Sequence, residues 1–173
     1  SQSHLGVAAV SHPGKRGKNN EDRYGVTAFR LEEPVSAPAV LAVLSDGIGG
    51  HRAGEVAAEM AVELISAYVA EHGEKTGPVQ LLQQAIQYAG QSIHQQAQAV
   101  REQAGMGATC ACVWIVANRL YTANVGASRI YLLRGGQIRQ LTTDHTWIQE
   151  ALENGLLQPE EAVGHPNAHV IRR

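Results

Sequence analysis

The acidic residues best suited to chemistry form two short groups in the first third of the chain. Glu21 and Asp22 lie where a loop meets a β-type run, and Asp46 directly follows the apolar run 39–45. An Asp that ends a buried strand costs free energy unless it is paired or binds a cation. Gly47 follows it and lets the backbone turn a carbonyl toward a ligand. Carboxylates, a carbonyl and waters suit Mg²⁺ or Mn²⁺.

If two ions shared Asp46, the water between them would become acidic enough to attack phosphorus near neutral pH. Two other interpretations of the same residues are open. In the purely structural alternative, Asp46 makes a turn that caps the following helix, and Glu21 and Asp22 are merely solvated. A nucleotide-binding regulator would use the segment DGIGGHRAGE without any metal, but that segment matches neither a P-loop nor G-x-G-x-x-G.

Composition narrows the class of protein. The chain has 173 residues, 44% of them hydrophobic, which predicts one domain over residues 1–173. Lysine and arginine (14) nearly balance aspartate and glutamate (16), so no broad basic surface is available for nucleic acid. No apolar run approaches the roughly 20 residues that cross a bilayer, and no signal pattern opens the sequence. We therefore expect a cytoplasmic protein without nucleic-acid or membrane partners.

The elements that would position the acidic residues follow from periodicity. Apolar stripes predict helices over 53–71 and 79–101, with shorter helices at 147–154 and 159–163. Apolar runs predict strands over 5–10, 24–29, 39–45, 108–116, 119–125, 128–133 and 137–141. The run 39–45 is apolar throughout, which predicts burial on both faces. Short connections between the later runs require antiparallel neighbours, so the fold class is α+β.

Two cysteines occupy the predicted strand 108–116. Cys110 and Cys112 are two residues apart, so their side chains lie on one face. Because no second cysteine pair or nearby histidine pair accompanies them, buried thiols are favoured over a zinc site.

Four ordered motifs resemble the bacterial metal-dependent protein phosphatases of type 2C. They are NNED (19–22), LSDGIGGHRAGEVAA (44–58), GMGATC (105–110) and NVGASRIYLLRGGQIRQLTTDHT (124–146). The resemblance begins near residue 6 and covers nearly the whole chain. It implies a four-layer α-β-β-α sandwich of antiparallel sheets flanked by helices. It also implies hydrolysis of phosphoserine and phosphothreonine by a water held between two Mn²⁺ or Mg²⁺ ions.

The resemblance assigns roles by position. Asp46 would bridge the two ions, the carbonyl of Gly47 would bind one of them, and Glu21 and Asp22 would bind directly or through water. His51 matches a histidine that faces the substrate, and the near-neutral pKa of a free histidine side chain suits a general acid for the leaving alkoxide. The alternative for His51 is an exposed loop histidine.

Two positions depart from the family pattern. An arginine that holds the substrate phosphate is replaced by Gly17, so Arg16 or Lys18 would take its place; lysine supplies a point charge rather than a bidentate fork. Ala127 replaces the aspartate that binds a third ion, so we expect two ions in the complete domain and no well-occupied third site.

The family pattern also continues beyond this sequence. Two further aspartate motifs complete its metal pair, whereas no aspartate follows Asp144 here. We expect the N-terminal two-thirds of a catalytic domain, incomplete at its C-terminus, with exposed sheet edges that permit self-association. An unusual short form that pairs with another chain is the alternative. The expected function is a serine/threonine protein phosphatase acting on the phosphoprotein substrates of a kinase, and the alternative is an inactive regulatory or binding module.

Overall fold

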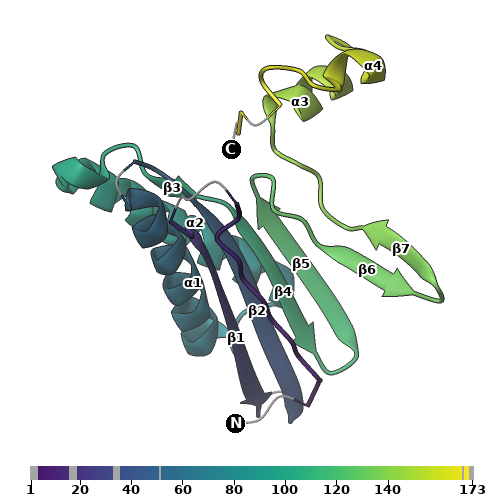
Figure 1. Cartoon of the computed structure of the whole chain (residues 1–173). Coiled ribbons are helices and arrows are strands. Elements are labelled where there is room, and N and C mark those ends of the chain that lie inside the picture. Colours follow the sequence, from purple (N-terminus) through teal and green to yellow (C-terminus); the bar gives the residue numbers. More distant parts are fainter. Residues whose placement is uncertain (1–3, 16–18, 33–35, 51, 169, 172–173) are drawn as a thin grey trace.

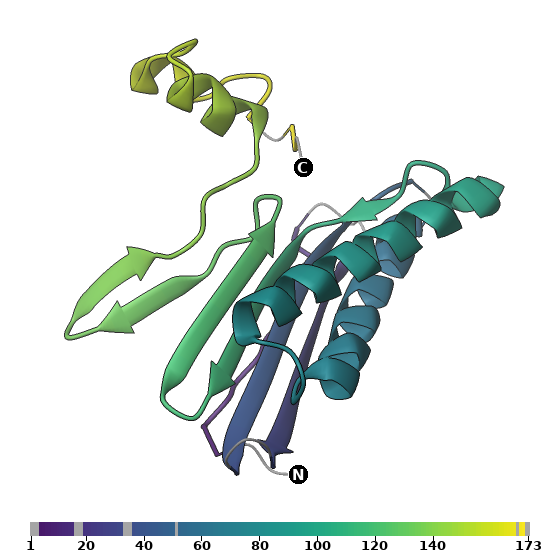
Figure 2. The ribbon, with the colours of Figure 1, turned by 180° about the vertical axis from the view of Figure 1, so that it is seen from behind.

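One antiparallel sheet covered on one face by two long helices forms the main body (Figures 1 and 2). The structure is a computed structural model that describes residues 4–15, 19–32, 36–50, 52–168 and 170–171. The strand order is β1-β2-β4-β5, and β3 pairs with the end of β2. The bounds are β1 Asp22–Leu31, β2 Ala37–Ile48, β3 Gly107–Ala108, β4 Cys110–Val116 and β5 Arg119–Val125.

The helices α1 (Ala53–His72) and α2 (Pro78–Ala99) run side by side on one face of the sheet, the face turned toward the viewer in Figure 2. A short 3₁₀ turn, η1 (Arg101–Gln103), leads from α2 into β3. Beyond β5, the hairpin of β6 (Tyr131–Arg134) and β7 (Gln137–Gln140) extends to one side, and α3 (Trp147–Glu153) and α4 (Pro159–Ala162) follow it. Among the described residues, no helix combines the length and apolar character needed to cross a membrane.

The core lies between the sheet and the two helices. Trp114 of β4 is 1% exposed and meets Phe29 of β1 edge to face, with ring centroids 5.5 Å apart. Leu41 of β2 and Ile65 of α1 complete the centre of this cluster. Because apolar residues of α1 recur at helical spacing, one side of the helix is buried against the strands. The packing fixes α1 against the end of β2, where the acidic residues lie.

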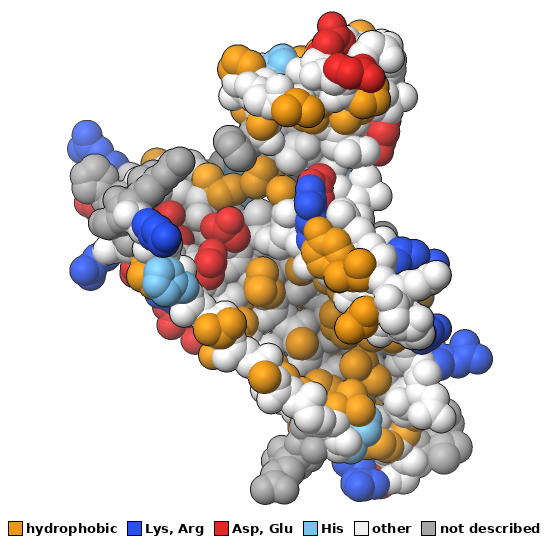
Figure 3. All heavy atoms as spheres, turned by 45° about the vertical axis from the view of Figure 1, so that its right-hand side comes forward, with side chains coloured by type: hydrophobic (Ala, Val, Ile, Leu, Met, Phe, Trp, Pro, Cys, Tyr) orange, Lys and Arg blue, Asp and Glu red, His pale blue; other side chains and the backbone are white. Residues whose placement is uncertain are grey.

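The opposite face of the sheet is open and apolar over much of its area (Figure 3). Tyr24, Val26 and Leu44 are 50%, 40% and 47% exposed. The prediction that the run 39–45 is buried on both faces is therefore wrong toward its end. On this face Val40 is buried, but Ala42 is only partly buried and Leu44 is exposed, whereas the residues that face the helices are buried throughout.

The remaining predictions have mixed outcomes. The α+β class, the antiparallel strands and all four helices are confirmed, and Cys110 and Cys112 are free buried thiols. Residues 5–10 form no strand; this exposed segment makes no ladder, and its residues 7–10 line a groove over the open sheet face. The predicted strand 128–133 begins only at Tyr131. Strand β2 continues past residue 45 to Ile48, because β3 pairs with its last two residues.

Candidate metal centre

The register of β1 and β2 brings the predicted acidic residues together. Asp22 pairs directly with Asp46 across the two strands. Side chains of directly opposed residues share a face, with Cβ atoms roughly 5 Å apart. Glu21 immediately precedes β1, and its backbone carbonyl accepts a 3.2 Å hydrogen bond from the N–H of Gly47. Asp22 and Asp46 therefore share the open face at one end of the sheet, and Glu21 lies beside them with its carboxylate next to the start of α1.

Electrostatics at this end of the sheet disfavour the charged form of Asp46. Burial raises the pKa of the Asp46 carboxyl above its ordinary value, and the neighbouring Asp22 and then Glu21 raise it further. A like charge nearby makes ionisation more costly, whereas a bound cation would reverse this effect. The cluster therefore has the electrostatic character of a cation site.

The three carboxylates line a pocket of about 400 Å³. Its other walls come from the segment before β1: His12, Pro13, Gly14, Lys15, Asn19 and Asn20. Asn20 stabilises this wall, since its Nδ2 donates to Ser11 Oγ at 2.7 Å and its Oδ1 accepts from the N–H of Asp22 at 3.1 Å. The pocket is open enough to admit a hydrated ion or a phosphate group.

Two glycines allow the beginning of α1 to approach the carboxylates. A Cβ on Gly54 would lie 2.6 Å from Glu21 Oε1, and a Cβ on Gly47 would collide with the backbone carbonyl of Gly54. The alternative in which Asp46 makes a turn that caps α1 is wrong. Asp46 lies inside β2, and the residue before α1 is Arg52, at φ 71° and without a side-chain cap.

The donor set fits a hydrated divalent cation. Within the described ranges, no three His, Cys, Asp or Glu side chains are grouped closely enough to hold an ion alone. Mg²⁺, however, keeps several waters and is usually held through only one or two carboxylates. The paired Asp22 and Asp46, with Glu21 beside them, meet that requirement.

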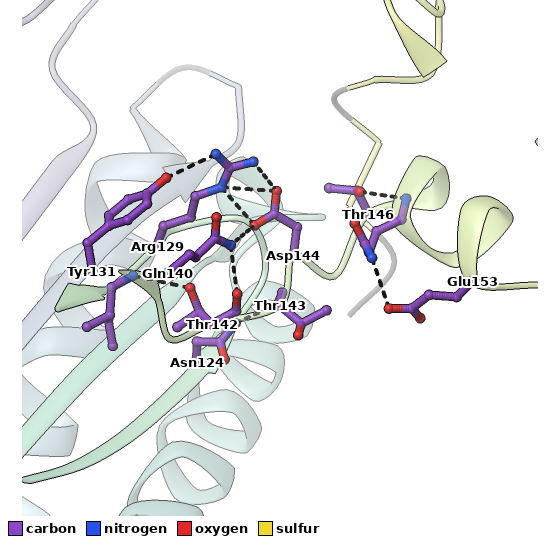
Figure 4. A network of polar contacts seen from close by, with 11 residues as sticks. Asn124, Arg129, Tyr131, Gln140, Thr142, Thr143, Asp144, Thr146 and Glu153 are labelled. Carbon is purple, nitrogen blue, oxygen red and sulfur yellow. Dashed lines mark hydrogen bonds and ion pairs between the residues drawn. The ribbon is translucent and has the colours of Figure 1, made fainter. Parts of the chain in front are cut away.

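A second pocket of about 500 Å³ adjoins Asp46 on its other side and is also lined by Ala127, Arg129 and Asp144. Arg129 and Asp144 form a bidentate ion pair there, with Nε–Oδ1 and Nη2–Oδ2 distances of 2.9 and 2.6 Å (Figure 4). This pair and the hydroxyl of Tyr131 raise the pKa of Arg129. The charge of Asp144 is balanced by Arg129, and Ala127 adds no carboxylate to the wall.

Sequence reasoning did not single out Thr109, which contacts the backbone of Asp46. Its N–H donates to the Asp46 carbonyl at 2.9 Å, and its Oγ1 accepts from the Asp46 N–H at 3.0 Å. The only signal in the sequence is its place in the motif GMGATC, which resembles the family without indicating a contact.

Comparison with known proteins decides the family. A family model described as "Protein phosphatase 2C" matches residues 11–160, most of the chain. The chain belongs to the protein phosphatase 2C family. The "Serine/threonine phosphatase stp" of Listeria innocua is 35% identical over 158 residues, which are 90% of this chain and 60% of that protein. The "Protein phosphatase PhpP" of Streptococcus pneumoniae is 36% identical over 169 residues, 95% of this chain and 65% of that protein.

Solved structures support the same family and fold. The serine/threonine phosphatase of S. agalactiae aligns with a TM-score of 0.76 and 32% identity, covering 92% of this phosphatase 2C chain and 64% of that one. The catalytic domain of PstP, solved with two manganese ions, aligns with a TM-score of 0.63 and 29% identity over 88% of this chain and 66% of its own. The architecture therefore fits an α-β-β-α sandwich. The phosphatase 2C chain spans 60 to 65% of the length of the relatives compared above.

Three predicted site residues of the phosphatase 2C chain lie outside the described residues. They are His51, Arg16 and Lys18. Their roles as general acid and phosphate ligands stay predictions. Lys15, the described basic residue next to them in sequence, does line the pocket that contains the three carboxylates.

Proposed function

We propose that this chain carries the metal centre of a serine/threonine protein phosphatase that hydrolyses phosphoserine and phosphothreonine in protein substrates. The observation that carries the proposal is the direct pairing of Asp22 with Asp46, next to Glu21, in a pocket open to solvent. Membership of the phosphatase 2C family supports the interpretation of this acidic cluster as a metal site.

In the complete domain, the side chains of the cluster would help to hold two Mn²⁺ or Mg²⁺ ions. Asp46 lies centrally, since it lines both pockets, and would bridge the ions; Glu21, Asp22 and the Gly47 carbonyl would complete the set that this chain supplies. When bound, such a pair supplies a water acidic enough to attack phosphorus near neutral pH. No third site is proposed, because Ala127 offers no side-chain oxygen where the second pocket meets Asp46.

The other residues act on the phosphate and the leaving group. Arg16 or Lys18 would bind the phosphate oxygens of the substrate, with Lys15 lining the same pocket. His51 would donate a proton to the leaving alkoxide, which its near-neutral pKa in free solution permits. The substrates would be phosphoproteins made by a serine/threonine kinase. We propose that residues 1–173 form part of one catalytic domain whose exposed sheet edges permit self-association.

Hydrolysis of p-nitrophenyl phosphate by the full chain, in EDTA and after addition of Mn²⁺ or Mg²⁺, tests the proposal. We expect turnover only with a divalent ion and at least about a hundredfold loss in Asp46→Asn. Glu59→Gln serves as the matched control, because Glu59 is an exposed acid on α1 outside both pockets. Turnover that persists in EDTA, or that Asp46→Asn leaves unchanged, contradicts the proposal. Mn²⁺ binding without any turnover in the longest natural form of the chain instead favours the regulatory module.

A further inference from the structure

The backbone hydrogen-bond ladder that joins β2 to β4 and β3 is interrupted at Asp46. The pairing of β2 with β4 ends at Leu44 and Ala111, and the pairing of β2 with β3 resumes at Gly47 and Ala108 in the same register. Asp46 and Thr109 are therefore directly opposed. In a hydrogen-bonded antiparallel pair, such residues exchange two backbone N–H···O bonds.

Only one of these two backbone bonds is present. The N–H of Thr109 donates to the Asp46 carbonyl at 2.9 Å, but the N–H of Asp46 donates to the Thr109 hydroxyl oxygen instead, at 3.0 Å. The Thr109 carbonyl, left free by this change, accepts a 2.7 Å bond from Ser45 Oγ. Side-chain oxygens thus replace the missing half of the backbone pair.

The hydroxyl of Thr109 also connects Asp46 to the loop that follows β5. Thr109 Oγ1 lies 2.6 Å from Ser128 Oγ, in a hydrogen bond that either group can donate. Gly126, at φ +90°, approaches so closely that an added Cβ would lie 2.7 Å from Thr109 Cγ2. This loop includes Ala127 of the second pocket. Thr109 is 2% exposed, so water cannot readily substitute for its hydroxyl.

We infer that Thr109 is a positioning residue for the metal centre: its hydroxyl, supported by Ser128, sets the backbone and hence the carboxylate direction of Asp46. Valine has nearly the same shape as threonine but lacks the hydroxyl. In Thr109→Val, the N–H of Asp46 loses its hydrogen-bond partner, because the nearby Thr109 carbonyl already accepts from Ser45 Oγ. Loss of an outer-shell partner of this kind commonly weakens metal binding by about 10- to 100-fold.

The first test measures Mn²⁺ affinity of the full chain by isothermal titration calorimetry without substrate. We expect Thr109→Val to bind at least about tenfold more weakly than the unsubstituted chain, and Thr109→Ser to bind within about threefold of it. Thr142→Val is the matched control. Thr142 is also buried, and its hydroxyl accepts a hydrogen bond from the backbone N–H of Ile130 rather than from Asp46. Equal affinity of Thr109→Val and Thr142→Val, or a Ser variant as weak as the Val variant, overturns the inference.

A second test needs no metal and so separates this inference from the proposed function on which it rests. Amide hydrogen exchange of Asp46, followed by NMR in EDTA, is expected to accelerate at least about tenfold in Thr109→Val and not in Thr109→Ser. Unchanged exchange overturns the inference even if Mn²⁺ binds. If the Val variant does not fold, Ser128→Ala replaces it: faster exchange at Asp46 supports the inference and unchanged exchange overturns it. Failure of the unsubstituted chain to bind Mn²⁺ would contradict the proposed function alone.

Discussion

The substitution Asp46→Asn is expected to stabilise the metal-free chain and to abolish its stabilisation by Mn²⁺. Asparagine keeps the size and shape of aspartate but removes the negative charge that faces Asp22 and Glu21. A raised carboxyl pKa means that the folded state binds its proton more tightly than the unfolded state. Ionised Asp46 therefore destabilises the fold above its folded pKa, and this cost disappears as the pH falls through that pKa toward the ordinary Asp value.

The expected magnitudes follow from the cross-strand geometry. Two unit charges about 5 Å apart in a water-like dielectric repel by about 1 kcal/mol. For a chain of this size, removing 1 kcal/mol of repulsion raises the melting temperature by about 2–4 °C. Mn²⁺ at about one hundred times its Kd stabilises the unsubstituted chain by about 2.7 kcal/mol, or about 5–10 °C. In the variant, the melting temperature in EDTA rises, whereas the increase caused by Mn²⁺ disappears. The two effects can therefore be measured separately.

Thermal unfolding followed by circular dichroism, in EDTA and in Mn²⁺, measures both effects. As the pH rises from the ordinary Asp pKa through the raised pKa of Asp46, the metal-free variant is expected to lose less stability than the unsubstituted chain. Glu59→Gln removes one charge from an exposed site on α1 and should preserve both the Mn²⁺ shift and the pH profile. A variant that melts lower in EDTA, or that keeps the full Mn²⁺ shift, would refute the electrostatic reasoning.

Three further substitutions test the packing and the second pocket. Gly47→Ala is expected to cost about 1–3 kcal/mol in urea unfolding, because its Cβ would collide with the backbone of Gly54; Gly50→Ala, whose Cβ would meet nothing within 4 Å, should be near neutral. Trp114→Ala is expected to cost about 3–5 kcal/mol by the same measurement, since this side chain fills the core. Ala127→Asp is expected to add one weakly bound Mn²⁺ per chain in calorimetric titration, and an unchanged number of bound ions would contradict that role.

Elements whose position depends only on their own residues were predicted correctly from local sequence patterns. Helical spacing of apolar residues located α1 and α2 to within a few residues. The pair Gly135 and Gly136 predicted the β6–β7 turn, and both have the positive φ that such a turn requires, 57° and 74°. The motifs in turn identified the three acidic residues that the structure brings together.

Features that depend on long-range pairing were not predictable in the same way. The end of β2 is set by β3, some sixty residues later in the chain, so the apolar run alone predicted an end at residue 45 and placed Asp46 in a turn. Residues 5–10 are apolar, but a strand also needs an available neighbour, and the described sheet offers them no ladder. The contact between Thr109 and Asp46 likewise follows from register, which sequence spacing does not contain.

The surroundings of the acidic cluster suggest why its repulsion persists in the fold. Arg23 directly follows Asp22, yet its guanidinium forms no ion pair with that carboxylate. Its Nη1 donates to the backbone carbonyls of Asn20 and Asp22 at 2.9 and 2.8 Å, and its Nη2 lies 3.8 Å from Glu55. Within the part of the chain that the structure describes, no basic side chain forms an ion pair with Asp22 or Asp46. The β1–β2 ladder thus holds two like charges together at a cost of about 1 kcal/mol, and a divalent ion can offset that cost.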